Sequence, residues 1–253
     1  MSTQPKTALI TGASKGVGRG IALGLARDGW DVAVNYNGDR KGAEATAAAI
    51  RELGRQAWVL QGDVGYRDQV ERMFAELDES AGTLSLLVNN AGVQTWAPLL
   101  ELAEEDFDRT IRTNLKGTFL CTKAAAARMK ESGGGGIVNI GSGANKTPFP
   151  NLVDYSASKG GIENLTRVSA VELGPYGIRV NCVAPGAIEF ERTKLESGDY
   201  AGTWSPLTPL RRVGQVEDVA KAVMYLASDG AAFVTGQTLY VDGGLWSQGP
   251  WPY

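Results

Sequence analysis

The sequence predicts an α/β protein with a doubly wound, seven-stranded parallel sheet that carries helices on both faces. Seven short apolar runs occur along the 253 residues, and most are continuous rather than alternating. Continuous runs are typical of strands that are buried on both faces of a parallel sheet. Segments of helical length separate successive runs, as the crossovers between parallel strands require. Ligands of such sheets bind outside the carboxyl ends of the strands, so functional residues are expected there.

Each element can be assigned in order along the chain. The strands are expected at residues 7–11, 31–36, 56–61, 84–89, 137–141, 178–184 and 238–242. The helices are expected at about 17–28, 41–53, 67–80, 104–130, 153–173 and 216–228. Residues 186–214 fit neither pattern and are expected to form an irregular substrate loop inserted in the domain. No repeat and no linker rich in Pro or Ser divides the chain, so residues 1–253 are expected to form a single domain.

Composition excludes several classes of protein. The net charge is −3 and no long run of like charge occurs, which argues against a nucleic-acid or membrane surface. No apolar stretch approaches the roughly 18 residues that a membrane span needs, and the N-terminus lacks a signal-peptide pattern. Cys121 and Cys182 have no partners spaced as metal ligands are, which favours two core thiols in a reducing compartment. The sequence therefore predicts a cytoplasmic protein with no metal site.

A glycine-rich turn follows the first strand. Gly12, Gly16 and Gly18 have the spacing GxxxGxG and open the first helix. Glycine lets the backbone approach a ligand, and a helix N-terminus favours phosphate groups. A plain glycine turn is the alternative, but the position between a first strand and a first helix favours a dinucleotide-binding, or Rossmann, site.

The end of the second strand bears on which dinucleotide binds. It reads Asn-Tyr-Asn at residues 35–37, with no carboxylate before Asp39, whereas an NAD site usually has an acidic residue there. Lys15, Arg40 and Lys41 could instead bind a 2′-phosphate through charge-assisted bonds. NADP(H) is therefore favoured over NAD(H), although the same cations could be solvated surface residues.

A tyrosine and a lysine point to proton transfer in a chain that has no histidine. Tyr155 and Lys159 are four residues apart, so they lie on one face of the helix expected at 153–173. A neighbouring ammonium favours the ionised form of a phenol, which makes tyrosine an effective acid and base near neutral pH. Ser142 ends a strand thirteen residues before Tyr155, where its hydroxyl could bind a substrate oxygen. Asn114 lies inside the long helix expected at 104–130, where asparagine has a below-average propensity.

Together these residues resemble the short-chain dehydrogenase/reductase family. The matching motifs occur in the order and spacing of the family, and they extend from residue 11 to residue 244. They are Thr11-Gly12, Gly16, Gly18, Asp63-Val64, Asn89-Asn90-Ala91-Gly92, Asn114, Ser142, Tyr155 with Lys159, Pro185-Gly186 and Asp242-Gly243-Gly244.

The resemblance implies a role for each of these residues. Tyr155 would be the general acid and base on the reacting oxygen, and Ser142 would bind the same oxygen. Lys159 would support the tyrosine and bind the nicotinamide ribose, while Asn114 would hold a water in a proton relay. The implied cofactor contacts are Gly12, Ser14, Lys15, Gly16, Val17, Gly18, Asn37, Asp63, Val64, Asn90, Ala91, Gly92, Tyr155, Lys159, Pro185, Gly186 and Ile188.

One position departs from the family pattern. Members commonly have a cofactor-binding threonine five residues after the proline of the Pro-Gly motif, where this chain has Phe190. Either Thr193 substitutes for it after a shift of the loop, or the nicotinamide contacts differ.

The loops at the carboxyl ends suggest the substrate. They contain aromatic residues mixed with amides and charges, which suits a small polyhydroxylated molecule, although each ring could instead pack within a loop or at a subunit interface. These aromatic residues include Trp96, Phe149, Tyr200 and Trp204. The segment around Tyr155 resembles glucose 1-dehydrogenases of the family, so a sugar or polyol is the first interpretation. Trp246 and Trp251 in the tail are expected to pack internally or at a subunit interface rather than on substrate.

Other functions are possible from the sequence alone. The runner-up is a 3-oxoacyl-(acyl-carrier-protein) reductase, although Gly133 and Tyr176 replace arginines that those enzymes tend to have, with Arg128 and Lys130 nearby. A nucleotide-sugar epimerase or lyase would normally have a longer C-terminal region. A non-catalytic NADP-sensing or interaction protein would usually lack the tyrosine or the lysine. The resemblance also implies a homotetramer in which the helices at 104–130 and 153–173 pair across subunits.

Overall fold

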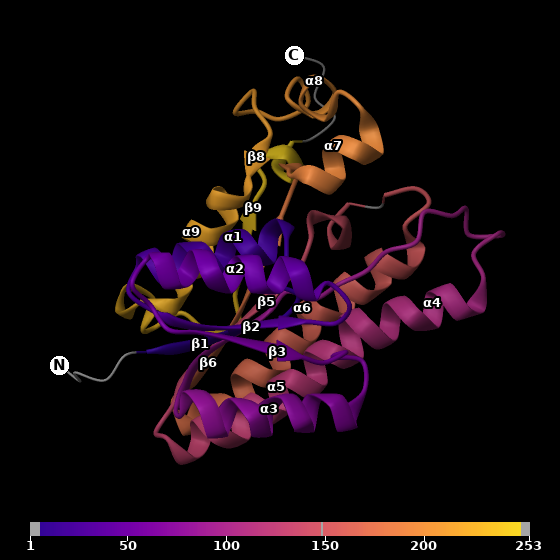
Figure 1. Cartoon of the computed structure of the whole chain (residues 1–253). Coiled ribbons are helices and arrows are strands. Elements are labelled where there is room, and N and C mark those ends of the chain that lie inside the picture. Colours follow the sequence, from indigo (N-terminus) through magenta and orange to yellow (C-terminus); the bar gives the residue numbers. More distant parts are fainter. Residues whose placement is uncertain (1–5, 148, 249–253) are drawn as a thin grey trace.

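The computed structural model describes residues 6–147 and 149–248, and its centre is one parallel sheet (Figure 1). The strand order is β3-β2-β1-β4-β5-β6-β9, and every pairing is parallel. This confirms the predicted seven-stranded, doubly wound sheet. The strands are β1 (Thr7–Ile10), β2 (Asp31–Tyr36), β3 (Ala57–Gln61), β4 (Leu84–Asn89), β5 (Gly135–Ile140), β6 (Ile178–Pro185) and β9 (Thr238–Val241).

Helices cover the sheet on both faces, as Figure 1 shows. One apolar cluster joins α1, α2 and α9 to one face, and a second joins α3, α5 and α6 to the other. Ala8 and Ile10 of β1 belong to the first cluster and Leu9 to the second, because successive side chains of a strand point to opposite faces. The main helices are α1 (Gly16–Arg27), α2 (Arg40–Glu52), α3 (Arg67–Ala81), α4 (Glu104–Thr110), α5 (Gly117–Glu131), α6 (Val153–Leu173) and α9 (Val216–Ala227).

The helix expected at 104–130 contains an unforeseen irregularity. A π-helical segment, η1 (Ile111–Lys116), lies between α4 and α5. Such a segment adds a residue to one turn and is frequent at functional sites. Here it contains Asn114, whose buried side chain bonds to the loop after β4 rather than to its own helix.

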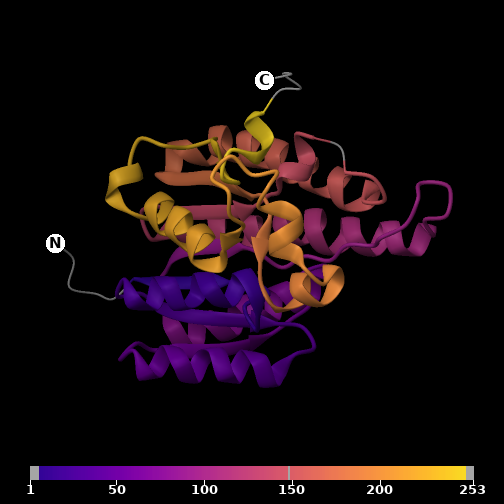
Figure 2. The same cartoon turned by 90° about the horizontal axis from the view of Figure 1, so that it is seen from above.

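The segment after β6 is more ordered than expected. The prediction of an irregular stretch over 186–214 is wrong, because β7 (Ile188–Glu189) pairs with β8 (Gly214–Gln215) and two short helices lie between them. These helices are α7 (Glu191–Ser197) and α8 (Tyr200–Trp204). The Asp199 carboxylate accepts a bond from the Gly202 N–H and caps α8. Figure 1 shows both helices (orange) standing clear of the sheet, and Figure 2 shows them from above, in front of the middle of the molecule.

Both cysteines are buried and free, as predicted for core thiols. Burial raises the pKa of the Cys121 thiol to about 12. Across residues 6–147 and 149–248, no helix has both the length and the apolar character needed to cross a membrane. In the same part of the chain, no three His, Cys, Asp or Glu side chains gather as metal ligands do.

Candidate active site

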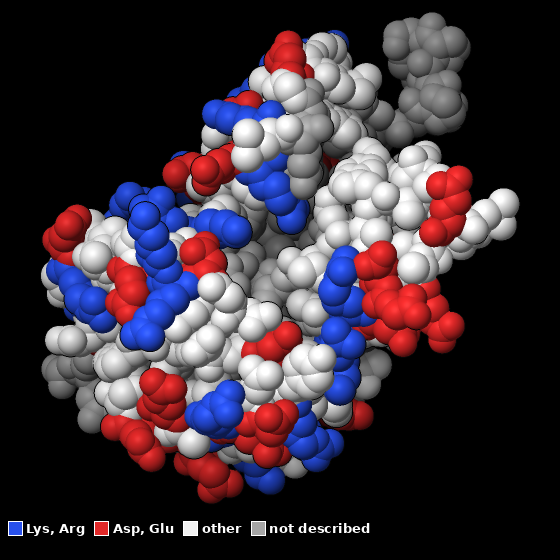
Figure 3. All heavy atoms as spheres, turned by 45° about the vertical axis from the view of Figure 1, so that its right-hand side comes forward, with Lys and Arg blue, Asp and Glu red and all other residues white. Residues whose placement is uncertain are grey.

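The predicted site residues follow four neighbouring strands at one edge of the sheet. Gly12 follows β1, Asn90 follows β4, Ser142 follows β5 and Gly186 follows β6. Because these strands are parallel and adjacent, their carboxyl ends meet at the same edge. Figure 3 shows this side of the molecule, with a hollow in the middle of the face and charges of both signs around it.

The turn between β1 and α1 requires its glycines. Gly12 and Gly16 have φ of 62° and 57°, a left-handed conformation that favours glycine. A Cβ on Gly18 would lie 2.4 Å from Asn90 Nδ2 and 2.5 Å from the Gly12 carbonyl oxygen. The turn therefore leaves room for no side chain at Gly18, and it holds its backbone against the end of β4.

Asn90 and Thr11 bind that turn to β4. The Asn90 side-chain amide donates to the carbonyl oxygens of Thr11 and Gly12, at 2.9 and 3.1 Å. The Thr11 hydroxyl accepts bonds from the backbone N–H groups of Asn90 and Ala91, at 2.9 and 3.0 Å. The amide nitrogen of Asn90 is thus engaged inside the protein, where it shapes the turn.

Asn35 is a residue of the site that the sequence analysis missed. Its Oδ1 accepts from the Gly12 N–H at 3.1 Å, and its Nδ2 donates to the carbonyl oxygens of Leu60 and Gly62, at 3.3 and 3.1 Å. The side chain is buried at the end of β2. A polar residue that directly follows the apolar run at residues 32–34, at the strand end where ligands bind, was the signal that could have identified it.

The ends of β2 and β3 bring two more predicted residues together. Asn37 Nδ2 donates to Asp63 Oδ2 at 3.2 Å, and Asp63 Oδ1 accepts from the Gly65 N–H at 2.9 Å. Val64 is buried and its side chain meets Gly117 of α5. Asn37 is exposed and Asp63 half-buried, so both remain within reach of a ligand beside this edge.

Three cationic residues lie at the starts of α1 and α2, beside the glycine turn and the end of β2. Lys15 is exposed at the start of α1, and Arg40 and Lys41 are exposed at the start of α2. The Arg40 Nε lies 3.7 Å from Glu44 Oε1, a solvent-exposed pair of the kind that contributes little. Asp39 caps α2 by accepting from the Gly42 N–H at 3.0 Å, so its carboxylate is engaged in the helix start.

Tyr155 and Lys159 lie on one face of α6 beside the end of β5. Lys159 is only 4% exposed, and its Nζ donates to the Ile140 carbonyl oxygen at 2.7 Å. The same Nζ lies 5.4 Å from the centroid of the Tyr155 ring. Ile140 precedes Ser142 by two residues. The lysine thus joins the helix of the tyrosine to the strand of the serine.

Ser142 begins the short 3-10 turn η2 (Gly143–Asn145). Its hydroxyl oxygen accepts from the Ala144 N–H at 3.2 Å. That bond leaves the hydroxyl proton available for another oxygen.

Asn114 connects the loop after β4 with α6. Its Nδ2 donates to the Val93 carbonyl at 2.9 Å and to the Ser158 hydroxyl at 3.0 Å, and its Oδ1 accepts from the Val93 N–H at 2.8 Å. Ser158 in turn donates to the Tyr155 carbonyl at 2.7 Å. A chain of bonds therefore runs from residue 93 to the backbone of the tyrosine.

Asp154 is a second residue that the sequence analysis missed. Its side chain is fully buried; Oδ1 accepts from the Tyr155 N–H at 2.6 Å and Oδ2 accepts from the Thr110 hydroxyl at 2.6 Å. A carboxylate in the first turn of a helix is stabilised by the helix dipole. Asp154 thereby fixes the start of α6 against α4, and its place directly before the tyrosine was the available signal.

The Pro-Gly motif precedes Phe190, the position at which this chain departs from the family pattern. A Cβ on Gly186 would lie 2.6 Å from the Asp242 Cβ, so this glycine is required where β6 meets β9. The Phe190 ring lies against Gly16, at 3.2 Å from where a Cβ would be. The Thr193 hydroxyl accepts from the Phe190 N–H at 2.9 Å and donates to the carbonyl oxygens of Ile188 and Phe190, at the start of α7. Phe190 therefore covers the glycine turn, and Thr193 stabilises a helix end.

Four aromatic rings from three segments form a cluster near the catalytic loops. Phe149 packs edge-on to Trp96 at 5.6 Å and stacks on Trp204 at 5.9 Å, and Tyr200 lies 6.2 Å from Trp204. We call Trp96, Phe149, Tyr200 and Trp204 the aromatic cluster. Trp246 packs internally against Gly143, in agreement with the expectation for it, whereas Trp251 lies outside the described residues.

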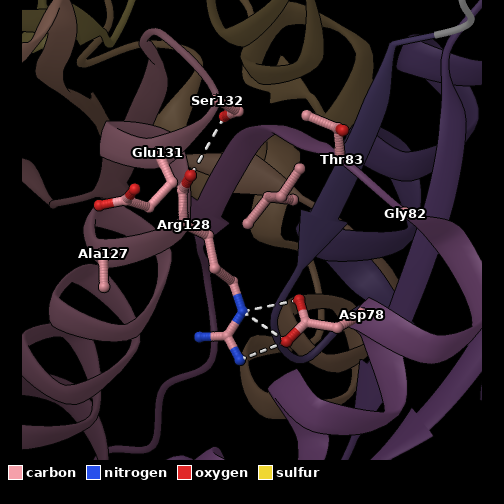
Figure 4. A pocket seen from close by; sticks show the side chains of 8 residues that line it. Asp78, Gly82, Thr83, Ala127, Arg128, Glu131 and Ser132 are labelled. Carbon is pink, nitrogen blue, oxygen red and sulfur yellow. Dashed lines mark hydrogen bonds and ion pairs between the residues drawn. The ribbon is translucent and has the colours of Figure 1, made fainter.

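A depression on the surface lies at the opposite edge of the sheet. Figure 4 shows it where α3 and α5 end and β4 begins, with Arg128 bound through its guanidinium to Asp78. The Ser132 hydroxyl donates to the backbone carbonyl oxygen of Arg128. None of the predicted catalytic or cofactor residues lines this depression.

Comparisons with known proteins agree with this geometry. A model of the family described as enoyl-(acyl carrier protein) reductase matches residues 12–246. A 3-oxoacyl-[acyl-carrier-protein] reductase of Staphylococcus aureus is 41% identical over 241 residues, which cover 95% of this chain and 98% of that protein. A short-chain dehydrogenase/reductase of Armillaria gallica is 40% identical, over 96% of this chain and 97% of that protein.

A solved structure is similar to this chain in both fold and sequence. A gluconate 5-dehydrogenase from Burkholderia cenocepacia, in complex with NADP and tartrate, has a TM-score of 0.90 and 36% identity, over 96% of each chain. In these comparisons identities of 36–41% extend along almost the whole chain, and the solved structure also has a high TM-score. The chain therefore belongs to the short-chain dehydrogenase/reductase family and is an NAD(P)-dependent oxidoreductase of alcohol and carbonyl groups.

Proposed function

We propose that this enzyme transfers a hydride between NADP(H) and the alcohol or carbonyl carbon of a small sugar or related polyol. The observation that carries the proposal is the buried Lys159, whose Nζ binds the Ile140 carbonyl and faces the Tyr155 ring, directly beside the strand that bears Ser142. The nicotinamide supplies or accepts the hydride, and the protein supplies position, charge and the proton.

The proton step belongs to Tyr155. In the direction of reduction its hydroxyl donates a proton to the carbonyl oxygen of the substrate, and in oxidation its phenolate takes the proton of the alcohol. The Ser142 hydroxyl donates a hydrogen bond to the same oxygen and stabilises the charge that develops there. The Lys159 ammonium stabilises the phenolate, and Asn114 keeps the backbone of Tyr155 in place through Ser158.

The cofactor would occupy the edge formed by the glycine turn and the ends of β2 and β4. Its diphosphate would lie at the N-terminus of α1, where unpaired N–H groups favour anions. Asn37 and Asp63 would meet the adenosine, and Lys15, Arg40 and Lys41 would bind the 2′-phosphate. The preference for NADP draws support from the absence of a carboxylate at residues 35–37 and from the NADP in the gluconate 5-dehydrogenase structure.

The substrate would bind between Tyr155 and the aromatic cluster. Rings mixed with amides suit a molecule that offers both a flat C–H face and several hydroxyl groups. The related gluconate 5-dehydrogenase, whose structure contains tartrate, favours this substrate class. In this proposal residues 1–253 act as one domain, and residues 186–214 form its substrate loop.

A 3-oxoacyl-(acyl-carrier-protein) reductase is the second candidate, favoured by the 41% identity to the Staphylococcus aureus enzyme. Such an enzyme must bind an acidic carrier. The two cations that could serve are engaged elsewhere: Arg128 is bound to Asp78, and Lys130 lies 4.4 Å from the centre of the Tyr176 ring. We therefore place the sugar or polyol first.

A homotetramer in the cytoplasm completes the proposal. The helices that the family resemblance pairs across subunits carry exposed apolar residues, among them Phe119 on α5 and Val168 and Val171 on α6. A second copy of the chain would cover them. Light scattering of the purified protein should give the mass of four chains, and a monomer would contradict this part of the proposal.

A substrate screen tests the function directly. Aldoses, polyols, keto acids and an acetoacetyl thioester are each supplied with NADP(H) and with NAD(H), and absorbance of the reduced nicotinamide is followed. Turnover that is fastest with a sugar or polyol and NADP supports the proposal. Turnover that is fastest with the thioester would transfer the assignment to the second candidate.

A further inference from the structure

The turn that carries Ser142 is attached to the catalytic helix by a pair of side chains. Asn145 lies at the end of η2, and its Nδ2 donates to Glu163 Oε2 on α6. Glu163 follows Lys159 by four residues, and Lys159 follows Tyr155 by four, so the three side chains share one face of the helix. The bond between Asn145 and Glu163 thus joins the turn of the serine to the helix of the tyrosine.

Glu163 has partners on its own helix and faces two neighbouring strands. Its side chain is 16% exposed, and Oε1 forms an ion pair with Arg167 on the next turn of α6. From β6 and β9 it is faced by Cys182 and Tyr240. The pKa of the Tyr240 phenol is raised, first by burial and then by the charge of Glu163, while the amide of Asn145 lowers it.

Two lysines also contribute to the electrostatic environment of the Asn145–Glu163 pair. Burial raises the pKa of the Cys182 thiol to about 11; the Lys159 ammonium opposes that rise, and Glu163 adds to it. From η2, the Lys146 ammonium lies 5.1 Å from the centre of the Tyr240 ring. The amide of Asn145 therefore meets an anion on α6 and a neutral phenol on β9.

The opposite side of the turn is fixed by packing. A Cβ on Gly143 would lie 1.6 Å from Trp246 Nε1, so the indole occupies the space in which any other residue would place its side chain. Trp246 itself is held by its backbone N–H, which donates to Asp242 Oδ2 at 3.0 Å. The three-residue turn therefore contacts this ring through Gly143 and the helix α6 through Asn145.

We infer that Asn145 and Glu163 are positioning residues that hold the Ser142 hydroxyl at the substrate oxygen it shares with Tyr155. The inference rests on the proposed function. Within residues 6–147 and 149–248 the Ser142 side chain has one hydrogen bond, to Ala144 inside its own turn, so its place relative to Tyr155 depends on how the turn is attached. A displacement of about 1 Å at such a group can lower the rate by roughly a hundredfold.

Two variants test this inference: one removes the hydrogen-bond acceptor, and the other replaces the donor by a second carboxylate. Glu163→Ala removes the acceptor and should lower kcat by roughly ten- to a hundredfold, with the affinity for NADPH unchanged. Asn145→Asp places two carboxylates face to face, and kcat should fall similarly. In that variant the two carboxylates share a proton at acidic pH, so its kcat relative to the native enzyme should recover as the pH falls.

The double variant provides the rescue. In Asn145→Asp with Glu163→Gln, an amide again faces a carboxylate, with donor and acceptor exchanged, and kcat should return toward the native value. Asn164→Asp, an exposed change of the same charge on α6, is the matched control and should leave kcat unchanged. A native kcat in Glu163→Ala, or no recovery in a folded double variant, would overturn the inference.

Hydrogen–deuterium exchange gives a readout that needs no substrate. The backbone amides of residues 143–147 should exchange faster in Glu163→Ala than in the native protein, while those of the glycine turn should not change. Unaltered exchange at 143–147 would refute the pair as an attachment. An enzyme inactive on every substrate, with the expected exchange, would instead reject the proposed function and leave the attachment standing.

Discussion

The two sides of the proposed site, which we call the cofactor edge and the substrate edge, are built in different ways. The cofactor edge is held by hydrogen bonds between side chains and backbone, such as those of Asn35 and Asn90 with the glycine turn. The substrate edge is held by contacts between rings, and Trp96 in it is 52% exposed. A site of fixed backbone geometry can bind one cofactor throughout a family, whereas packed, exposed rings can be exchanged without disturbing the sheet.

The largest loss of activity is expected from a change at Tyr155, which we place between the cofactor edge and the substrate edge. Tyr155→Phe removes the hydroxyl that moves the proton, so kcat should fall by roughly 10²–10⁴-fold. Because the phenyl ring keeps its place on α6, NADPH affinity measured by fluorescence titration should not change. Substantial turnover in this variant would contradict the proposed mechanism.

The next largest effect is expected at the cofactor edge, on both stability and NADPH binding. Gly18→Ala would force a Cβ to within 2.5 Å of the Gly12 carbonyl oxygen and the Asn90 amide. Overpacking of this kind costs roughly 1–3 kcal/mol, so the free energy of unfolding should fall and NADPH binding should weaken with it. Gly174→Ala, where no atom lies within 4 Å of the added Cβ, is the control for both denaturant unfolding and titration.

A smaller effect should separate NADP from NAD. Lys15→Ala removes a charged donor for the 2′-phosphate, and NADP affinity should weaken by roughly tenfold. NAD affinity should be unchanged, because NAD lacks that phosphate. Arg27→Ala, an exposed cation at the far end of α1, is the matched control. Equal losses for the two cofactors would remove the assignment of Lys15.

The smallest effect is expected at the substrate edge. Trp204→Ala removes the ring that stacks on Phe149, and KM for the sugar or polyol should rise by roughly twofold to tenfold. NADPH affinity should remain at the native value. Trp204→Phe preserves an aromatic face and should restore most of the loss in steady-state assays. An unchanged KM in Trp204→Ala would place the substrate away from the aromatic cluster.

The same contrast explains how much the sequence could predict. The seven apolar runs specified the sheet, and local spacing was enough to place Tyr155 and Lys159 on one helix face. Asn35, Asp154 and Glu163 were missed because each also bonds to a residue of another element, and spacing along the chain does not show those bonds. The helices within 186–214 were missed because they are short and because the β7–β8 pair, which joins distant residues, defines the segment.

That small β7–β8 pair has a consequence for engineering. Ile188 lies opposite Gly214, so the chain leaves the scaffold and returns to it at neighbouring points. Doubling the length of a tethered segment costs only about 0.6 kcal/mol of closure entropy. Residues 190–213 could therefore be exchanged as a cassette, which would graft the selectivity of one relative onto the proton-transfer apparatus of another.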